Sequence, residues 1–168
     1  FIERDGTDVG SSVGLMVNEL SKYIERKTRD ARIGIPLGKR SLGEPIPANV
    51  EALYSGMSIE LATANVEGLK AFFMGAGDQQ DGESFYEYLV TIDAQFNGEL
   101  LGDVIRDQFD LAISETSEIP APFSETVETN PTPAEEAHEA IQKLVVLIKA
   151  DMSSALGVVI TYQDNDGD

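Results

Sequence analysis

The sequence predicts an all-α fold, a helical bundle of about four long amphipathic helices. Apolar residues recur at spacings of three and four along four long segments, which places them on one face of each helix. Between these segments there is no alternation of apolar and polar residues of the kind that half-buried strands show. The chain has 168 residues, 42 % of them hydrophobic, which is enough for a single domain over residues 1–168 with its own core.

The first helix is expected from about Thr7 to about Arg32. Its apolar face comprises Val9, Val13, Met16, Val17, Leu20, Ile24 and Ala31. Charged residues fall largely on the opposite face, which we expect to be in contact with solvent; they are Lys22, Glu25, Arg26 and Arg29. Glycine and proline in the segment from Ile33 to Pro47 end the helix and predict an irregular connector.

The second helical segment runs from about Ala48 to about Met74, interrupted at Ser55-Gly56. Its apolar stripe comprises Val50, Leu53, Tyr54, Met57, Leu61, Ala64 and Phe72. We expect Ser58 to cap a fresh helix after the interruption, because a serine hydroxyl can accept a hydrogen bond from a free backbone N–H of the first turn.

The third helical segment runs from about Glu83 to about Ser114. Its apolar pattern comprises Phe85, Leu89, Ile92, Phe96 and Leu100. Gly98 and Gly102 weaken this helix, each by about 1 kcal/mol relative to alanine, so a bend or a close contact with a neighbour is expected there.

An acidic, proline-rich loop is expected at about residues 117–133, exposed and available to a partner. Pro133 suits the first turn of the fourth helix, and Gly157 suits its C-terminal cap. The apolar stripe of this helix comprises Ile141, Leu144, Val145, Ile148, Met152, Ala155 and Leu156. The β-branched segment Val158–Tyr162 is expected to form either a small strand or an extended plug against the bundle.

Composition excludes several classes of function. Twelve basic against 30 acidic residues give a net charge of −18, which argues against nucleic acid and against anionic lipid as partners. The absence of cysteine removes disulfides, thiolate catalysis and cysteine-rich metal sites. No run of 18 apolar residues exists, so no transmembrane segment is predicted. The first five residues have neither an initiator methionine nor the profile of a signal peptide, and we expect a mature form or part of a longer protein.

Residues with catalytic or metal-binding potential are few. Glu135 and His138 have the Glu-x-x-His spacing of di-iron bundles, but such a site needs two of these pairs, so His138, the sole histidine, is expected on a surface helix start. Asp164–Asp168 begins like a calcium loop yet lacks the glutamate at position twelve, and a solvated acidic terminus is expected. Ser55 and Ser58 have no base assigned to them, which serine nucleophiles require.

The order of several motifs resembles the C-terminal half of imelysin-like proteins, the family classed as M75 peptidases. The motifs are Arg32-Ile33-Gly34-Ile35-Pro36-Leu37-Gly38, Val50-Glu51-Ala52-Leu53-Tyr54-Ser55-Gly56-Met57-Ser58, Asn65-Val66-Glu67-Gly68-Leu69, Asp151-Met152-Ser153-Ser154-Ala155-Leu156-Gly157-Val158 and Asp166-Gly167-Asp168. The resemblance covers the chain from about Val13 to Asp168.

The resemblance implies one half of a fold made of two helical bundles, in an exported protein of Gram-negative bacteria. Such a protein lies in the periplasm or at the outer membrane, often as a lipoprotein, and some relatives belong to iron-uptake systems. The family signature Gly-x-His-x-x-Glu lies in the N-terminal half, and His138 does not match it, because no glutamate stands three residues on. A site between the two bundles would take Glu51, Ser55, Ser58, Asp166 and Asp168 from this chain.

Three functions follow as hypotheses. The first is an envelope protein that binds a metal, iron or calcium, or another ligand in an iron-uptake role, with the N-terminal half of the same protein and envelope iron-uptake components as partners. The second is a metallopeptidase of the M75 type, although a hydrolytic metal site needs about three protein ligands and this chain has one histidine. The third is a non-catalytic helical interaction module that contacts its partner through the loop at 117–133.

Overall fold

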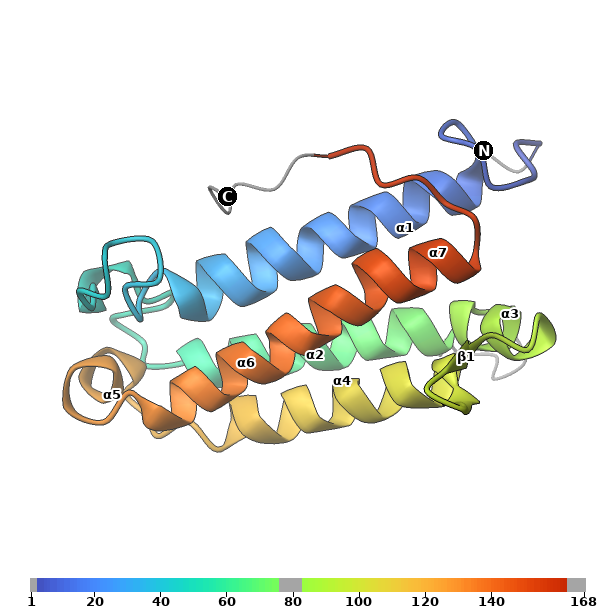
Figure 1. The fold of residues 1–168 in the computed structure, drawn as a ribbon. Helices are drawn as coiled ribbons and strands as arrows, with labels where there is room; N and C mark the ends of the chain where they lie inside the picture. Colours follow the sequence, from blue (N-terminus) through green and yellow to red (C-terminus); the bar gives the residue numbers. More distant parts are fainter. Residues whose placement is uncertain (1–2, 76–82, 163–168) are drawn as a thin grey trace.

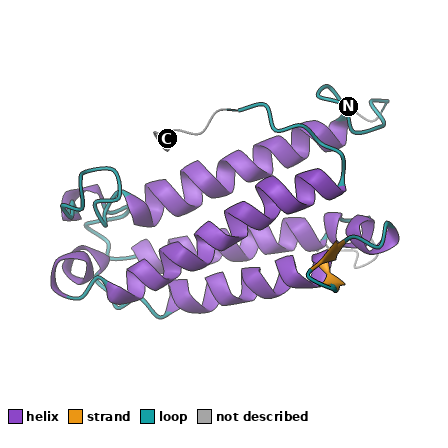
Figure 2. Cartoon of the chain, viewed as in Figure 1, coloured by secondary structure: helices purple, strands orange, loops and turns teal. Residues whose placement is uncertain are grey.

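The computed structural model describes residues 3–75 and 83–162, which form an up-and-down bundle of four long helical rods (Figure 1). The rods are α1 (Ser12–Tyr23) continued by the π-helical η1 (Ile24–Gly34), then α2 (Ser58–Met74), then α4 (Leu101–Ser117), and finally α6 (Thr132–Val146) continued by the π-helical η3 (Leu147–Met152) and by α7 (Ser153–Ala155). Each rod packs against the next, and the fourth packs back against the first through α6 and η1. The predicted all-α bundle is therefore confirmed (Figure 2).

The apolar faces of the four rods meet along the axis of the bundle. The largest fully buried side chains include Ile24, Ile33, Phe73, Ile105, Phe109, Ile141, Leu144, Ile148 and Met152. The predicted stripe of the fourth helix is confirmed over Ile141–Met152, whereas the stripe of the second helix is wrong in phase. Ile59, Ala62, Val66 and Phe73 form the buried face of α2, while Tyr54, Met57, Leu61 and Phe72 are exposed.

The phase error arises because the second segment is not one continuous helix. Residues before α2 form only the 3₁₀ turn η2 (Pro47–Asn49) and further turns, with left-handed backbone at Ala52 and Gly56. Periodicity cannot be extended through such a break. The capping prediction for Ser58 is also wrong, because Met57 occupies the cap position and Ser58 is the first residue of α2. The first helix likewise begins at Ser12 and not at Thr7, with the Ser11 hydroxyl accepting a hydrogen bond from the Gly14 N–H.

The third predicted helix is interrupted by a β-hairpin. The chain forms α3 (Phe85–Thr91), the strands β1 (Gln95–Phe96) and β2 (Glu99–Leu100), and then α4. Asn97 and Gly98 have positive φ angles of 51° and 89°, which suits a two-residue hairpin turn. Gly102 is explained by close packing, since a Cβ at this position would lie 3.1 Å from a ring carbon of Tyr86.

The segment at 117–133 is largely exposed, as expected, but it is not a loop throughout. It contains α5 (Phe123–Thr129), and Ile119, Phe123 and Val127 are buried. Apolar residues spaced by four therefore anchor this segment to the bundle, while most of its other residues are exposed. The predictions for the fourth helix are confirmed, since Pro133 lies in the first turn of α6 and Gly157 has a left-handed φ of 67°.

The segment after α7 runs back along α1 as an extended strap (Figure 1). The Asn18 amide donates to the Val159 carbonyl at 2.9 Å, and its oxygen accepts from the Thr161 N–H at 2.8 Å. The extended-plug alternative for residues 158–162 is therefore the correct one. In residues 3–75 and 83–162, none of the helices has the length and apolar character that crossing a bilayer requires.

Candidate functional site

The segment between η1 and α2 folds over one end of the bundle (Figure 1). Gly38 makes this fold possible, because its φ is 82° and a Cβ there would lie 2.4 Å from the Glu44 carbonyl oxygen. The Ile46 N–H then donates to the Pro36 carbonyl at 2.8 Å, which closes the segment on itself. Residues 35–57 therefore form an ordered, folded connector at the end of η1.

Three of the five predicted site residues lie in this segment or directly after it. The Arg32 guanidinium donates to the Glu51 carboxylate, and the Ser58 hydroxyl donates to the Glu51 carbonyl. Ser55 lies in the same turn, with its hydroxyl donating to the Ala52 carbonyl at 3.2 Å. We call Arg32, Glu51, Ser55 and Ser58 the corner. Asp166 and Asp168 lie outside the described residues.

The Glu51 carboxylate is the part of the corner that is open to solvent. Its side chain is 44 % exposed, against 19 % for the Arg32 side chain that holds it. The Nε of Arg32 is buried and has no hydrogen-bond partner among the described residues. The corner thus presents the Glu51 carboxylate to solvent in a fixed orientation, held by the less exposed Arg32 guanidinium. Its oxygens can accept further hydrogen bonds or bind a cation.

His138 does not occupy the exposed helix start predicted from the sequence. It is half-buried against the end of η1, where a Cβ on Gly34 would lie 3.2 Å from the His138 Nε2. Burial, followed by the nearby positive charges of Arg29 and Lys39, lowers the pKa of His138 from 6.5 to about 4. The imidazole is therefore neutral at pH 7 and lies among cations, which disfavour a metal ion beside it.

Two of the cations near His138, Arg29 and Arg40, are paired with Asp30. Asp30 accepts from the Arg29 Nε at 2.6 Å and from an Arg40 nitrogen at 2.7 Å. Burial acts to raise the pKa of Asp30, but the hydrogen bonds from Arg29 and Arg40 outweigh it and hold the pKa below its ordinary value. This arrangement ties residues 35–57 to η1 through the side chain of Arg40.

Glu25 and Arg29 are buried, which corrects the prediction that they face solvent. Their side chains are 2 % and 5 % exposed, and the carboxylate lies 3.7 Å from the guanidinium. The Arg29 guanidinium also donates to the Gln142 side chain of α6. Both residues lie in η1, and they follow the buried Ser21 of α1 at successive spacings of four, which continues a polar part of the inner face.

Lys149 and Tyr162 complete this buried polar cluster from the C-terminal end of the chain. The Glu25 carboxylate accepts from the Lys149 ammonium at 3.3 Å and from the Tyr162 hydroxyl at 2.8 Å. The Tyr162 hydroxyl also lies 2.9 Å from the Ser21 hydroxyl. The cluster therefore joins η1, η3 and the strap, and its groups are engaged with one another rather than directed at a ligand.

The described residues do not assemble a metal site or a serine-type catalytic site. No group of three or more His, Asp or Glu side chains within residues 3–75 and 83–162 is placed to hold a metal ion. Ser58 donates its hydroxyl proton to a backbone carbonyl, which does not activate an oxygen for attack. Glu51 is thus a single potential ligand, and a complete site around it requires donors from elsewhere.

Two large apolar side chains of the segment 35–57 are entirely exposed. Leu42 and Tyr54 are 103 % and 101 % exposed, and both lie within residues 35–57. Leu42 also has a left-handed φ of 57°, a conformation that costs about 1–2 kcal/mol for a residue with a side chain. Single exposed hydrophobics are common on protein surfaces, and these two share a segment with the open Glu51 carboxylate. The helical periodicity predicted neither of them as exposed.

One of the comparisons with known proteins identifies a family. The family model described as imelysin, Peptidase_M75, matches residues 3–150. No curated protein and no solved structure is similar enough to this chain to match it.

Proposed function

Because this chain belongs to the imelysin family, we propose that it is the binding half of an imelysin-like protein of the Gram-negative cell envelope, in the periplasm or at the outer membrane, with a role in iron uptake. In this proposal the corner forms one wall of a site for a metal or another ligand. The N-terminal half of the same protein forms the other wall and supplies the remaining donors.

The full exposure of Leu42 and Tyr54 within residues 35–57 is the observation that carries this proposal. An aromatic and an aliphatic side chain standing free of their own domain are typical anchors of a protein interface. A second helical bundle seated on them would cover the Glu51 carboxylate, which is 44 % exposed in this chain. Exclusion of water would then strengthen the attraction of that carboxylate for a cation.

A metal site shared in this way explains why the corner holds only one open carboxylate. A closed site needs several ligands: six to eight oxygens for calcium, and a mixture of imidazole and carboxylate for iron. Asp166 and Asp168, together with side chains of the other bundle, are proposed as the additional oxygen donors. Binding a metal without a hydrolytic centre is the function that the corner supports best.

The first experiment measures metal-dependent stabilisation in the full-length protein. Fe³⁺ and Ca²⁺ are titrated while the melting temperature is followed, since a ligand that binds only the folded state stabilises it by about 2.7 kcal/mol at 100 times Kd. We expect Glu51→Gln to reduce the rise in melting temperature. An equal rise for the isolated 168-residue chain would contradict a shared site.

The second experiment tests the covering bundle. The double substitution Leu42→Ser with Tyr54→Ser is expected to loosen the contact between the two halves, measured by limited proteolysis, and to abolish the metal-dependent rise. Leu111→Ser is the matched control, because Leu111 is 42 % exposed on α4, in a different part of the bundle. Unchanged metal binding in the double variant would reject the proposal. Peptide cleavage that a chelator abolishes would favour the metallopeptidase alternative instead.

A further inference from the structure

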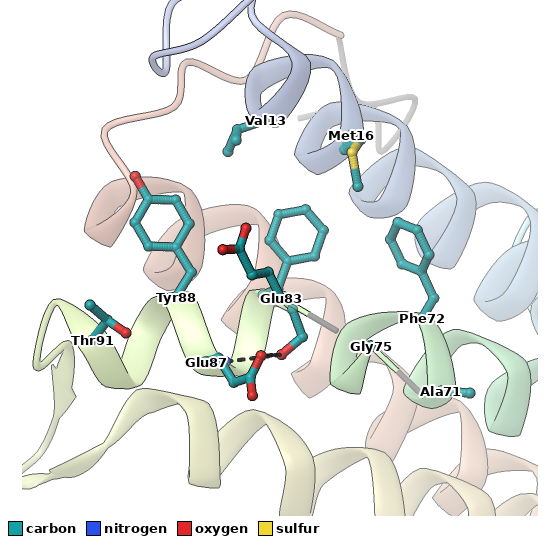
Figure 3. Close-up of a pocket in the computed structure, with 11 residues that line it drawn as sticks. Val13, Met16, Ala71, Phe72, Gly75, Glu83, Glu87, Tyr88 and Thr91 are labelled. Carbon is teal, nitrogen blue, oxygen red and sulfur yellow. Dashed lines mark hydrogen bonds between the residues drawn. The ribbon is translucent and has the colours of Figure 1, made fainter. Parts of the chain in front are cut away.

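The bundle is open at the end opposite the corner, where a cavity lies between α1 and the helices α2 and α3 (Figure 3). The first rod packs on α2 through η1, but in the described residues α1 makes no comparable contact with α2 or α3. Between α1 on one side and α2 and α3 on the other lies a cavity of about 790 Å³. Cavities of about 300–1,000 Å³ are the size in which proteins hold small organic ligands.

The walls of the cavity are apolar and aromatic. Met16 from α1 and Phe72 from α2 point toward each other across the opening, and Phe85 and Tyr88 of α3 complete the lining (Figure 3). Phe72 and Tyr88 are 46 % and 37 % exposed, although similar rings elsewhere in the bundle, such as Phe73, are fully buried. The cavity therefore presents ring faces and a thioether to a ligand, and burial of these groups would be favourable.

The charge at the cavity is negative only. Glu83 and Glu87 lie among the lining residues, and the part of the lining that the structure describes contains no Lys, Arg or His. Glu87 accepts a hydrogen bond from the Ser84 hydroxyl at 3.3 Å. Within the described residues, Glu83 has no ion-pair partner. In Figure 3 the Glu83 side chain lies on the same side of α3 as Tyr88, whereas the Glu87 carboxylate lies against Ser84 on the α4 side. A cationic group in the cavity would therefore meet the Glu83 carboxylate and aromatic rings, both of which attract it.

From this combination we infer that the cavity between α1, α2 and α3 binds a small cationic amphiphile, an organic amine carrying an apolar chain or ring. The apolar part lies against Met16, Phe72 and Phe85, and the ammonium lies beside Glu83 and the ring of Tyr88, with Glu87 adding negative charge at the rim. This site is independent of the corner, which lies at the other end of the bundle (Figure 1).

A matched series of ten-carbon probes tests the inference. Decylamine is positively charged at pH 7, decanol is neutral and decanoate is negatively charged, so the series changes head-group charge while the chain length stays constant. Titration calorimetry below the aggregation concentration of each probe is expected to give saturable binding, with decylamine tighter than decanol by about tenfold and decanoate weakest. Equal affinities for the three probes, or no saturable binding of decylamine, would overturn the inference.

Two variants locate the site. Glu83→Gln with Glu87→Gln should bring the affinity for decylamine down to that for decanol, while decanol binding stays unchanged. Its matched control is Glu125→Gln with Glu128→Gln on α5, which makes the same change in net charge at the other end of the bundle (Figure 1). Phe72→Ala removes an exposed ring and should weaken binding of decylamine and decanol alike. If the α5 control reduces the preference for decylamine as much as the α3 variant, general charge attraction explains the binding and the inference fails.

Discussion

The buried ion pair between Glu25 and Arg29 provides the sharpest test of how this fold is held together. In Glu25→Ala, the Arg29 and Lys149 cations lose the carboxylate that lies 3.7 Å and 3.3 Å from them. Removing one partner of a buried pair costs about 3–5 kcal/mol, because the remaining charge stays in a poorly solvated place. We expect about 3 kcal/mol, since Arg29 retains Asp30 and Lys149 is 21 % exposed and can turn toward water.

The assay is thermal and urea unfolding followed by circular dichroism. For a chain of this size, 1 kcal/mol corresponds to about 2–4 °C, so the melting temperature of Glu25→Ala should fall by about 6–12 °C. Replacing both partners, Glu25→Met with Arg29→Met, should recover part of that free energy of unfolding, because the buried guanidinium is removed together with its carboxylate. Recovery is incomplete, since Lys149 also loses Glu25 and Asp30 keeps only Arg40 of its two arginine partners.

The control lies on the same rod. Glu19 and Lys22 form an ion pair of 2.6 Å, shorter than the buried one, but their side chains are 71 % and 39 % exposed. Glu19→Ala should therefore cost less than about 1 kcal/mol, because solvent-exposed ion pairs contribute little. If Glu25→Ala costs no more than Glu19→Ala, burial does not determine the strength of the pair, and the reasoning is refuted.

Three further predictions concern other parts of the chain. A nuclear magnetic resonance titration should give His138 a pKa of about 4, and, because this lies below the ordinary 6.5, stability should be lost as pH falls from about 6.5 to 4, a loss that His138→Gln removes. Gly38→Ala should destabilise the protein more than Gly43→Ala in urea unfolding, since both have positive φ but only Gly38 has a carbonyl 2.4 Å from the new Cβ; equal costs would show that φ alone matters. Asn18→Ala should increase hydrogen exchange at the Thr161 amide, with about 1–2 kcal/mol lost from the free energy of unfolding; unchanged exchange would contradict the anchoring of the strap.

The bundle could be predicted from the sequence because its core obeys one simple periodicity. The buried positions Ile141, Leu144, Ile148 and Met152 follow helical spacing, and so their contribution to the core is visible without the structure. The same rule failed at the second helix, since it was extended through the left-handed backbone at Ala52. The hairpin was missed although Asn97-Gly98 is a strong turn signal, because a helical pattern was given more weight than the local turn residues.

The candidate site was only partly accessible to such reasoning. The motif order led to Glu51, Ser55 and Ser58, and the structure brings Glu51 and Ser58 into contact. The burial of Glu25 was missed because charged residues were assigned to the outer face by their type. Its position follows the buried Asn18 and Ser21 at spacings of seven and four, which helical periodicity does describe. The cavity beside α3 could not be predicted for a different reason. A gap between helices depends on their relative positions in space, and the periodicity of a single helix contains no information about those positions.

The strap across α1 has a consequence for the order in which the protein can acquire its structure during synthesis. Asn18 leaves the ribosome well before its hydrogen-bond partner Thr161, which is 143 residues away along the chain. The first rod therefore waits, with part of its apolar face uncovered, until nearly all of the described chain has been translated. Closing so long a loop costs more entropy than closing a short one, although each doubling in length adds only about 0.6 kcal/mol.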